Sequence, residues 1–219
     1  MLSPGDISAI LLDAAGRRCE EEGLGYAEIM EKLDTCWMTG ALEQRQLLAV
    51  PAGRDLTVTA GERTQDPVKF MRTVTLWLDG QEAATCTFTF IAVHRTRRTI
   101  RRLSRLEPYL APPGAVSEHI SVPRLNFGRE LPQAGHFSVT AADCDPNGHM
   151  NTANYIRAVC HTLGTPGAPN CITVCFEREC LPGETLCFYA ENGQIEGRRG
   201  DGSVSFRALI TAERERQYD

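Results

Sequence analysis

The stretch Asp143-Cys144-Asp145-Pro146-Asn147-Gly148-His149-Met150-Asn151-Thr152-Ala153-Asn154 separates a segment of extended character from one that can form a helix. The preceding residues, 135–142, alternate apolar and polar side chains as a strand does, and residues 151–163 contain no helix breaker. A strand therefore leads into a helix here, with carboxylates, amides and an imidazole gathered at the helix N-terminus. Free N–H groups and the helix dipole stabilise negative charge at such a place. The turn, including the N–H groups near residues 148–150, is expected to suit a reaction that generates an oxyanion.

The same residues also fit the opening of a calcium-binding loop, in which Asp143, Asp145, Asn147 and Gly148 would occupy the first six positions. The twelfth position of that loop should be a bidentate Glu, and here it is Asn154. A helix should precede the loop, whereas the pattern before this turn is that of a strand. The context therefore disfavours calcium.

Composition places the chain among ordinary globular proteins. Its 219 residues suffice for one large domain or two small ones, and the net charge of −5 predicts neither nucleic-acid nor membrane binding. No apolar run approaches the roughly 20 residues that span a bilayer, and the N-terminus has no signal or transit composition. We therefore expect a cytoplasmic protein.

The nine cysteines are odd in number and contain no C-x-x-C pair, which indicates buried, reduced thiols rather than a disulfide framework. A zinc site from Cys171, Cys175, Cys180 and His161 would match no common ligand spacing. We predict no metal site.

The order of predicted elements repeats along the chain. The first half is expected to hold two helices followed by about five antiparallel strands, at 6–19, 26–33, 36–42, 45–50, 56–60, 70–78 and 84–93. The second half is expected to hold a strand, a helix and three strands, at 137–142, 151–163, 171–178, 185–191 and 204–213. The segment 107–123 is rich in proline and has no periodicity, so it is predicted as the linker between domains 1–106 and 124–219.

The turn at 143–155 resembles the D-x-D-x-N-x-H-V-N-N-x-x-Y signature of the acyl-acyl carrier protein thioesterases of plants and bacteria. Phe176-Glu177-Arg178-Glu179-Cys180 resembles their E-Y-R-R-E-C segment, and Thr96-Arg97-Arg98 the T-R-R that closes their first domain. This resemblance implies an α+β, tandem (double) hot-dog fold, in which each unit is a long helix wrapped by an antiparallel sheet. It also implies an enzyme of fatty acid biosynthesis.

Carried over to this sequence, the resemblance implies a catalytic set of Asp145, Asn147, His149 and Glu179, without a cofactor. Cys180 matches a cysteine that has been considered as the nucleophile, and Asn151 is a further candidate. The sequence departs from the signature at three positions, Pro146, Met150 and Thr152, and Asn154 is a candidate to replace the amide lost at 152. The distance from His149 to Glu179 is also short, which predicts a truncated helix.

The residues themselves point to the same chemistry. Thioester hydrolysis needs an activated water or nucleophile and a donor for the oxyanion. His149 can accept a proton near neutral pH if a carboxylate, from Glu179 or Asp145, orients its ring. Asn147 can donate an amide N–H to the oxyanion or to water.

One strong run of charge contains Arg97, Arg98, Arg101 and Arg102. Such runs are usually solvated strand ends. The alternative function is docking of acyl carrier protein, an acidic partner. Nucleic acid is a poorer interpretation, because no aromatic residues interleave the arginines.

We therefore predict an acyl-acyl carrier protein thioesterase, monomeric or homodimeric. Two alternatives remain open, namely an acyl-CoA thioesterase and a hot-dog protein that binds acyl groups without hydrolysing them. The sequence does not say which apolar residues of the first half line an acyl pocket.

Overall fold

The computed structural model describes residues 1–65, 67–106, 124–168 and 170–212. The elements in chain order are α1 (Pro4–Glu21), α2 (Tyr26–Leu33), β1 (Thr35–Gln46), β2 (Thr57–Gln65), β3 (Lys69–Leu78), β4 (Gln81–His94), η1 (Leu103–Arg105), β5 (Gln133–Ser138), η3 (Ala141–Asp143), α3 (Thr152–Leu163), β6 (Asn170–Phe176), β7 (Thr185–Glu191), β8 (Gln194–Arg198) and β9 (Val204–Ala212). The predicted α+β class is confirmed. The predicted linker at 107–123 lies outside the described residues, so the domain boundary stays a prediction.

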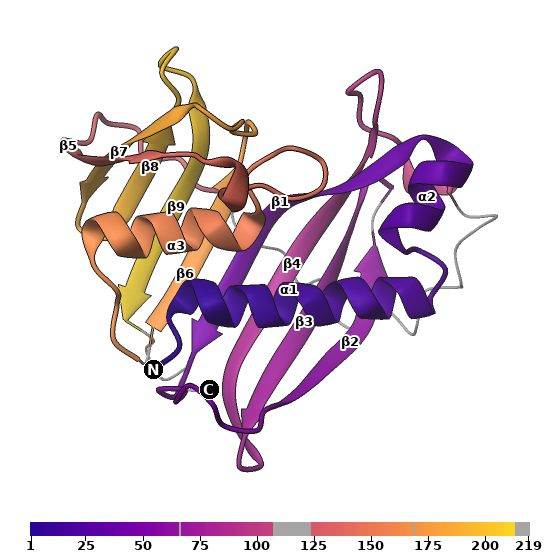
Figure 1. Ribbon diagram of the computed structural model, residues 1–219, viewed down its shortest axis with the longest axis horizontal. Helices are drawn as coiled ribbons and strands as arrows, with labels where there is room; N and C mark the ends of the chain where they lie inside the picture. The colour runs from indigo at the N-terminus through magenta and orange to yellow at the C-terminus, as the bar shows by residue number, and fades with distance from the viewer. Residues whose placement is uncertain (66, 107–123, 169, 213–219) are drawn as a thin grey trace.

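A single antiparallel sheet carries the whole structure (Figure 1). Its nine strands run in the order β2-β3-β4-β1-β6-β9-β8-β7-β5. We call β1–β4 with α1 and α2 the N-terminal half, and β5–β9 with α3 the C-terminal half. The halves join where β1 pairs with β6, from Ala41 opposite Cys175 to Gln46 opposite Asn170. This pairing turns two sheets into one and removes an unpaired edge from each half.

Helices α1 and α3 lie on the same face of the sheet, one over each half (Figure 1). Helix α1 begins with a capping box, in which Ser3 and Asp6 bond each other's backbone N–H, with Pro4 following the cap. Its buried face carries Ile7 and Leu11 at helical spacing, and the helix spans the predicted range 6–19. Helix α3 has 12 residues and α1 has 18, so the C-terminal half carries the shorter helix.

The two helices touch at the start of α1. A Cβ on Gly5 would lie 2.3 Å from Cγ of Arg157 and 3.2 Å from the carbonyl oxygen of Ala153, both on α3. Arg157 also binds the Asp6 carboxylate, with Nη2 2.9 Å from Oδ1. Glycine thus permits a close crossing that joins the two halves above the sheet.

The prediction of two strands at 36–42 and 45–50 is wrong, because a single strand, β1, runs through both segments and ends at Gln46, and residues 47–50 lie in no strand. The N-terminal half therefore has four strands. The register of β1 against β4 shifts between Thr39 and Ala41, where Gly40 forms a bulge. A Cβ on Gly40 would lie 2.6 Å from Cδ1 of Ile91. The irregularity therefore lies at Gly40, inside the predicted strand 36–42, whereas Glu43 and Gln44 at the predicted break pair regularly with Thr87 and Cys86.

Strand β8 was not predicted. It follows a hairpin turn at Asn192 and Gly193, both with positive φ, like the turn between β3 and β4 at Asp79 and Gly80, where the Asp-Gly pair is itself typical of a hairpin. Within the described residues, no helix is long and apolar enough to cross a membrane.

Candidate active site

Asp145 organises the turn that precedes α3. Its carboxylate Oδ1 accepts hydrogen bonds from the backbone N–H of Asn147 at 2.8 Å and of His149 at 3.4 Å. Its carbonyl accepts from the N–H of Gly148 at 2.9 Å, and Gly148 takes a φ of 80°, which favours glycine. The Asp145 carboxylate therefore holds the backbone of the loop in shape. It is not the carboxylate that partners the histidine ring.

The next N–H groups of the turn are occupied as well. The N–H of Met150 donates to the carbonyl of Cys180 at 2.9 Å, and Asn151 caps α3 by accepting from the N–H of Ala153 at 2.9 Å. The N–H groups of residues 148–150, which were expected to add fixed dipoles beside the oxyanion, thus each have an acceptor within the protein. These donors are occupied by hydrogen bonds that hold the loop in its conformation.

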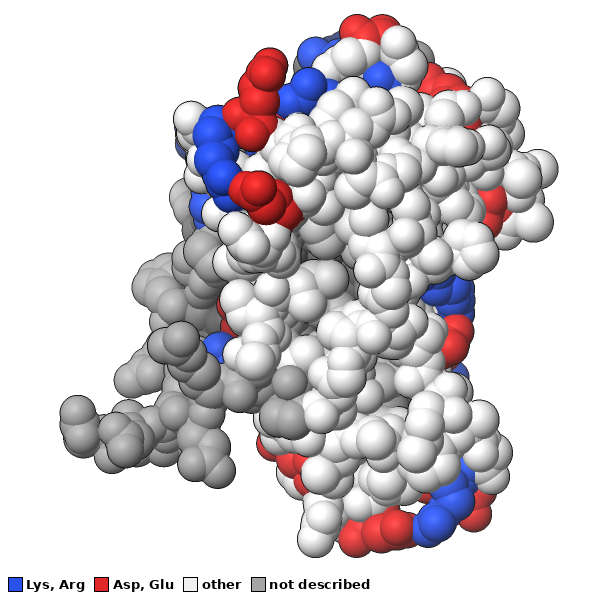
Figure 2. Space-filling model, turned by 90° about the vertical axis from the view of Figure 1, so that its left-hand side faces the viewer, with Lys and Arg blue, Asp and Glu red and all other residues white. Residues whose placement is uncertain are grey.

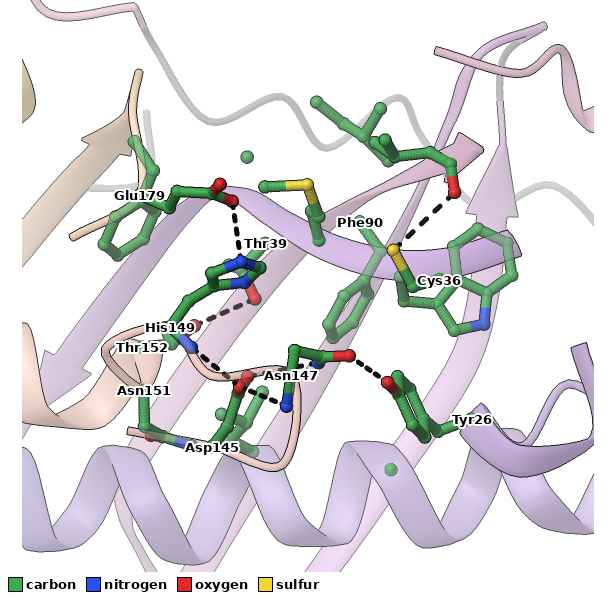
Figure 3. Close-up of a pocket in the computed structure, with 18 of the residues that line it drawn as sticks. Tyr26, Cys36, Thr39, Phe90, Asp145, Asn147, His149, Asn151, Thr152 and Glu179 are labelled. Atoms are coloured by element: carbon green, nitrogen blue, oxygen red, sulfur yellow. Dashed lines mark hydrogen bonds and ion pairs between the residues drawn. The ribbon is translucent and has the colours of Figure 1, made fainter. Parts of the chain in front are cut away.

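The side-chain amide of Asn147 is oriented from both ends (Figure 3). Its Nδ2 donates to Oδ2 of Asp145 at 3.3 Å, and its Oδ1 accepts from the hydroxyl of Tyr26 on α2. A carboxylate can only accept here, so the amide nitrogen must face Asp145. One N–H of Nδ2 remains for a ligand, because the other is used by Asp145. Tyr26 was missed by the sequence analysis, since it lies in the other half.

His149 and Glu179 face each other across the site. Nε2 of His149 lies 3.3 Å from Oε2 of Glu179, which follows β6. The loop carrying Glu179 is anchored by the backbone of Cys180, whose N–H donates to the hydroxyl of Tyr155 at 3.0 Å and whose carbonyl accepts from Met150. Burial raises the pKa of Tyr155 above its usual range, so its hydroxyl stays protonated. The predicted partners His149 and Glu179 are thus brought together by the contact between the turn and this loop.

The thiol of Cys180 is not part of this arrangement. Cys180 is fully buried, its Sγ contacts Oγ of Ser205 at 3.3 Å, and it does not line the cavity described below. Burial raises the pKa of the thiol, which disfavours the thiolate that a nucleophile needs. The structure therefore separates Cys180 from the other candidate residues.

A cavity of about 620 Å³ lies between the helices and the sheet, and the other candidates share it. Asp145, Asn147, His149, Asn151 and Glu179 line one side of it, together with Tyr26 and Arg98. Its remaining wall is mainly apolar and comes mostly from the N-terminal half, namely Leu12, Cys19, Leu24, Cys36, Trp37, Met38, Phe70, Phe90, Ile91, Val93 and Ile100. The polar side is partly open, with His149 21% and Glu179 29% exposed, whereas Phe70 is 1% exposed.

Thr152, one of the departures from the resembled signature, and Asn154, the candidate to replace the amide lost there, occupy different environments. Thr152 lines the cavity and bonds Thr39 of β1, with 3.2 Å between their hydroxyl oxygens. Asn154 donates instead to the carbonyl of Asp143 at 2.9 Å and accepts from Arg157 at 2.7 Å. Asn154 is not among the residues that line the cavity, so the expectation that it replaces the lost amide is wrong.

The four arginines at positions 97, 98, 101 and 102 differ in their exposure and in whether they reach the cavity. Arg98 reaches the cavity and pairs with Oε2 of Glu179. Arg97 and Arg102 are exposed, Arg101 is half-buried, and none of these three lines the cavity. By contrast, the face at the β5 end of the sheet is largely uncharged across its middle (Figure 2).

The aspartates of the calcium-like motif do not converge. Asp143 accepts from the N–H and the hydroxyl of Thr140 at 2.8 Å and 2.6 Å, while Asp145 holds the turn. Within the described part of the chain, no three His, Cys, Asp or Glu side chains are grouped so that they could hold a metal ion.

No protein-family model matches the sequence, and no curated protein does. Solved structures do match. An acyl-ACP thioesterase from Bacteroides thetaiotaomicron superposes with a TM-score of 0.73 at 16% identity, covering 96% of this chain and 90% of that chain. A protein assigned as an oleoyl thioesterase from Lactobacillus plantarum gives 0.74 at 18% identity, with 96% and 89% covered. The 12:0-ACP thioesterase from Umbellularia californica gives 0.72 at 18% identity, with 97% and 90% covered.

These likenesses extend over nearly the whole chain, so the shared architecture includes both halves and their junction. The chain has the double hot-dog fold of acyl-ACP thioesterases, as predicted.

Proposed function

We propose that this protein hydrolyses the thioester of an acyl-acyl carrier protein and releases a free fatty acid. One observation carries the proposal: His149, Glu179 and Asn147 converge on the open, polar side of a cavity whose remaining wall is mainly apolar. An acyl chain would occupy the apolar part, which places its carbonyl carbon beside the polar residues. The likeness in fold to acyl-ACP thioesterases supports the same substrate class.

In the proposed mechanism His149 is the general base. Oε2 of Glu179 lies 3.3 Å from Nε2 of the imidazole. In the proposed mechanism this carboxylate keeps the proton on Nε2 and leaves Nδ1 to take a proton from a water molecule. The water oxygen attacks the thioester carbon, and the carbonyl oxygen becomes an oxyanion. The imidazolium then returns the proton to the leaving sulfur as the C–S bond breaks. The reaction consumes only thioester and water, so the proposal assigns it no cofactor.

Asn147 stabilises the oxyanion through its remaining amide N–H. Asp145 and Tyr26 hold the amide in place before the substrate arrives, so little reorganisation is needed when charge develops. A single donor of this kind is typically worth about a hundred- to a thousandfold in rate. The roles are therefore distinct, with Asp145 positioning, Asn147 binding the oxyanion and His149 moving the proton.

The acidic carrier protein would dock through the exposed arginines. Arg97 and Arg102 are exposed beside the turn that carries Arg98 into the site, so a partner bound there would approach the polar side of the cavity. Complementary charge raises the rate of encounter, and its effect falls with ionic strength. All nine cysteines are free thiols, which supports a reducing compartment, and we propose the cytoplasm.

The test is hydrolysis of a panel of acyl thioesters on carrier protein and on CoA. We expect turnover that prefers the carrier protein and falls about a hundred- to ten-thousandfold in His149→Ala. His161→Ala, on the exposed side of α3, is the matched control and should keep full activity. Preference for CoA would identify an acyl-CoA thioesterase. Saturable acyl binding without turnover would identify a binding protein and contradict the proposal.

A further inference from the structure

Arg98 has a backbone conformation that few residues with side chains adopt. Its φ is 54°, in the left-handed region. The turn is closed by hydrogen bonds from the N–H of Arg98 to the carbonyl of His94 at 2.8 Å, and from the N–H of His94 to the carbonyl of Thr99 at 2.9 Å. This turn follows β4 in the N-terminal half, yet it delivers the guanidinium to Glu179 in the C-terminal half.

Arg98 and His149 bind the same oxygen. Oε2 of Glu179 accepts from Nη2 of Arg98, and it lies 3.3 Å from Nε2 of His149. The three side chains are 41%, 21% and 29% exposed for Arg98, His149 and Glu179, so solvent screens their charges only in part.

The charge of Arg98 has a chemical consequence for its neighbours. A carboxylate without a counter-charge favours the protonated form of an adjacent imidazole, and protonated His149 cannot accept a proton from water. A guanidinium on the same carboxylate offsets that attraction. It also binds the Glu179 carboxylate and so holds it in place beside the imidazole ring.

We propose that Arg98 is a positioning residue that sets the protonation of the Glu179–His149 pair, so that the imidazole is neutral and correctly oriented near neutral pH. The inference rests on the proposed function for its catalytic meaning. Its physical content, the coupling of Arg98 to the titration of His149, does not depend on any activity.

Other charged or titratable groups lie near the Glu179–His149 pair, and several of them are bound to partners of their own. The turn contributes Asp145, whose carboxylate is bound by backbone N–H groups. The same cavity is lined by Glu20 of α1, Tyr26 of α2, Cys36 of β1, and Glu177 and Arg178 after β6, and Glu177 binds Arg207. Arg95, in the same turn as Arg98, does not line the cavity and binds Asp34. Of the charged groups named here, only Arg98 is described as an ion-pair partner of Glu179.

The experiment follows the five histidines by NMR in protein labelled at histidine, with the His149 signal assigned through a His149→Gln variant. In Arg98→Gln the midpoint of the His149 titration should move to higher pH by about half to one pH unit. Arg98→Lys restores a positive charge and should return most of the shift. Arg97→Gln removes the same charge from the neighbouring position, and Arg97 forms no ion pair with the described residues, so it should shift the midpoint much less.

The pH dependence of kcat/KM provides the second readout. Its acidic limb should move to higher pH in Arg98→Gln, in step with the NMR midpoint, and return in Arg98→Lys. An unchanged midpoint in Arg98→Gln, with the fold intact, would overturn the inference. A shifted midpoint in a protein without hydrolase activity would uphold the coupling and refute the proposed function, so the two failures are distinguishable.

Discussion

Tyr26 donates its hydroxyl hydrogen to Oδ1 of Asn147, a residue 121 positions away in the sequence and in the other half of the fold. Burial, followed by the nearby charges of Cys36 and Asp145, raises the pKa of Tyr26, so the phenol remains a donor at neutral pH. The amide proposed to bind the oxyanion is therefore aligned by a residue from the other half of the fold.

Replacing Tyr26 by Phe removes this donor while keeping the ring. We expect kcat to fall about tenfold, which corresponds to about 1.4 kcal/mol, because the amide loses one of its two anchors. KM and the melting temperature should change little. Tyr189→Phe on β7, where the ring packs under Arg198, is the control. A kcat equal to that of the parent would show that Asp145 alone orients Asn147.

Replacing Cys180 by Ala distinguishes a water mechanism from a thiol nucleophile. The side chain is buried and bonded to Ser205, so we expect activity within about threefold of the parent and a loss of stability of about 1 kcal/mol from the small cavity. Steady-state hydrolysis and thermal unfolding measure the two effects. A thousandfold loss of kcat in a folded variant would restore Cys180 as the nucleophile.

The crossing of α1 and α3 at Gly5 predicts an asymmetric response to alanine. Gly5→Ala places a methyl group against Arg157 and Ala153 and should destabilise the protein by about 1 to 3 kcal/mol. Gly16→Ala in the same helix meets nothing within 4 Å and should stabilise it by about 0.5 to 1 kcal/mol. Chemical denaturation of both variants tests this, and equal effects would show that the helices do not cross as described.

The loop after Glu179 predicts a pH-dependent stability. The hydrogen bond from Arg199 is the main cause that lowers the pKa of Glu184 below its ordinary value of 4.5, with a further contribution from the N–H of Leu181. The unfolded chain therefore takes up the proton first as the pH falls. The stabilisation is present above pH 4.5 and is lost as the pH falls through the lower pKa of the folded state.

Glu184→Gln should thus cost about 0.5 to 1 kcal/mol at pH 7, and the difference from the parent should disappear in acid. Thermal unfolding between pH 7 and pH 3 measures it. Glu31→Gln, at an exposed residue that forms no ion pair within the described ranges, should track the parent throughout. A difference that persists undiminished at the acidic end would contradict the assignment of the shift to Glu184.

The sequence was sufficient to predict those features of the structure that depend on residues close to one another in the chain. The helical face of α1, the Asp79-Gly80 hairpin and the strand-turn-helix around His149 follow from neighbouring residues. Strand β8 escaped because it is short and polar, and its buried Glu196 depends on Arg198 and Arg207 for compensation. The Asn192-Gly193 pair was the signal that could have revealed it.

The candidate site could likewise be predicted only where its residues are neighbours in the sequence. His149, Asn147 and Asp145 lie in one turn, so their proximity is visible in the sequence, whereas Tyr26 and Arg98 reach the site only through the tertiary fold. The fate of the backbone donors was likewise hidden. Whether an N–H is free depends on Cys180, which meets Met150 only after the chain has folded.

The pairing of β1 with β6 also makes the site independent of concentration. In a hot-dog protein assembled from separate chains, mass action governs whether the subunits that share a site remain together. Here the two halves belong to one chain, so each is held beside the other at a high effective concentration. Dilution therefore cannot separate Tyr26 and Arg98 from Asn147 and Glu179. The specific activity per chain should therefore stay constant at dilutions that would take apart a site shared between two subunits.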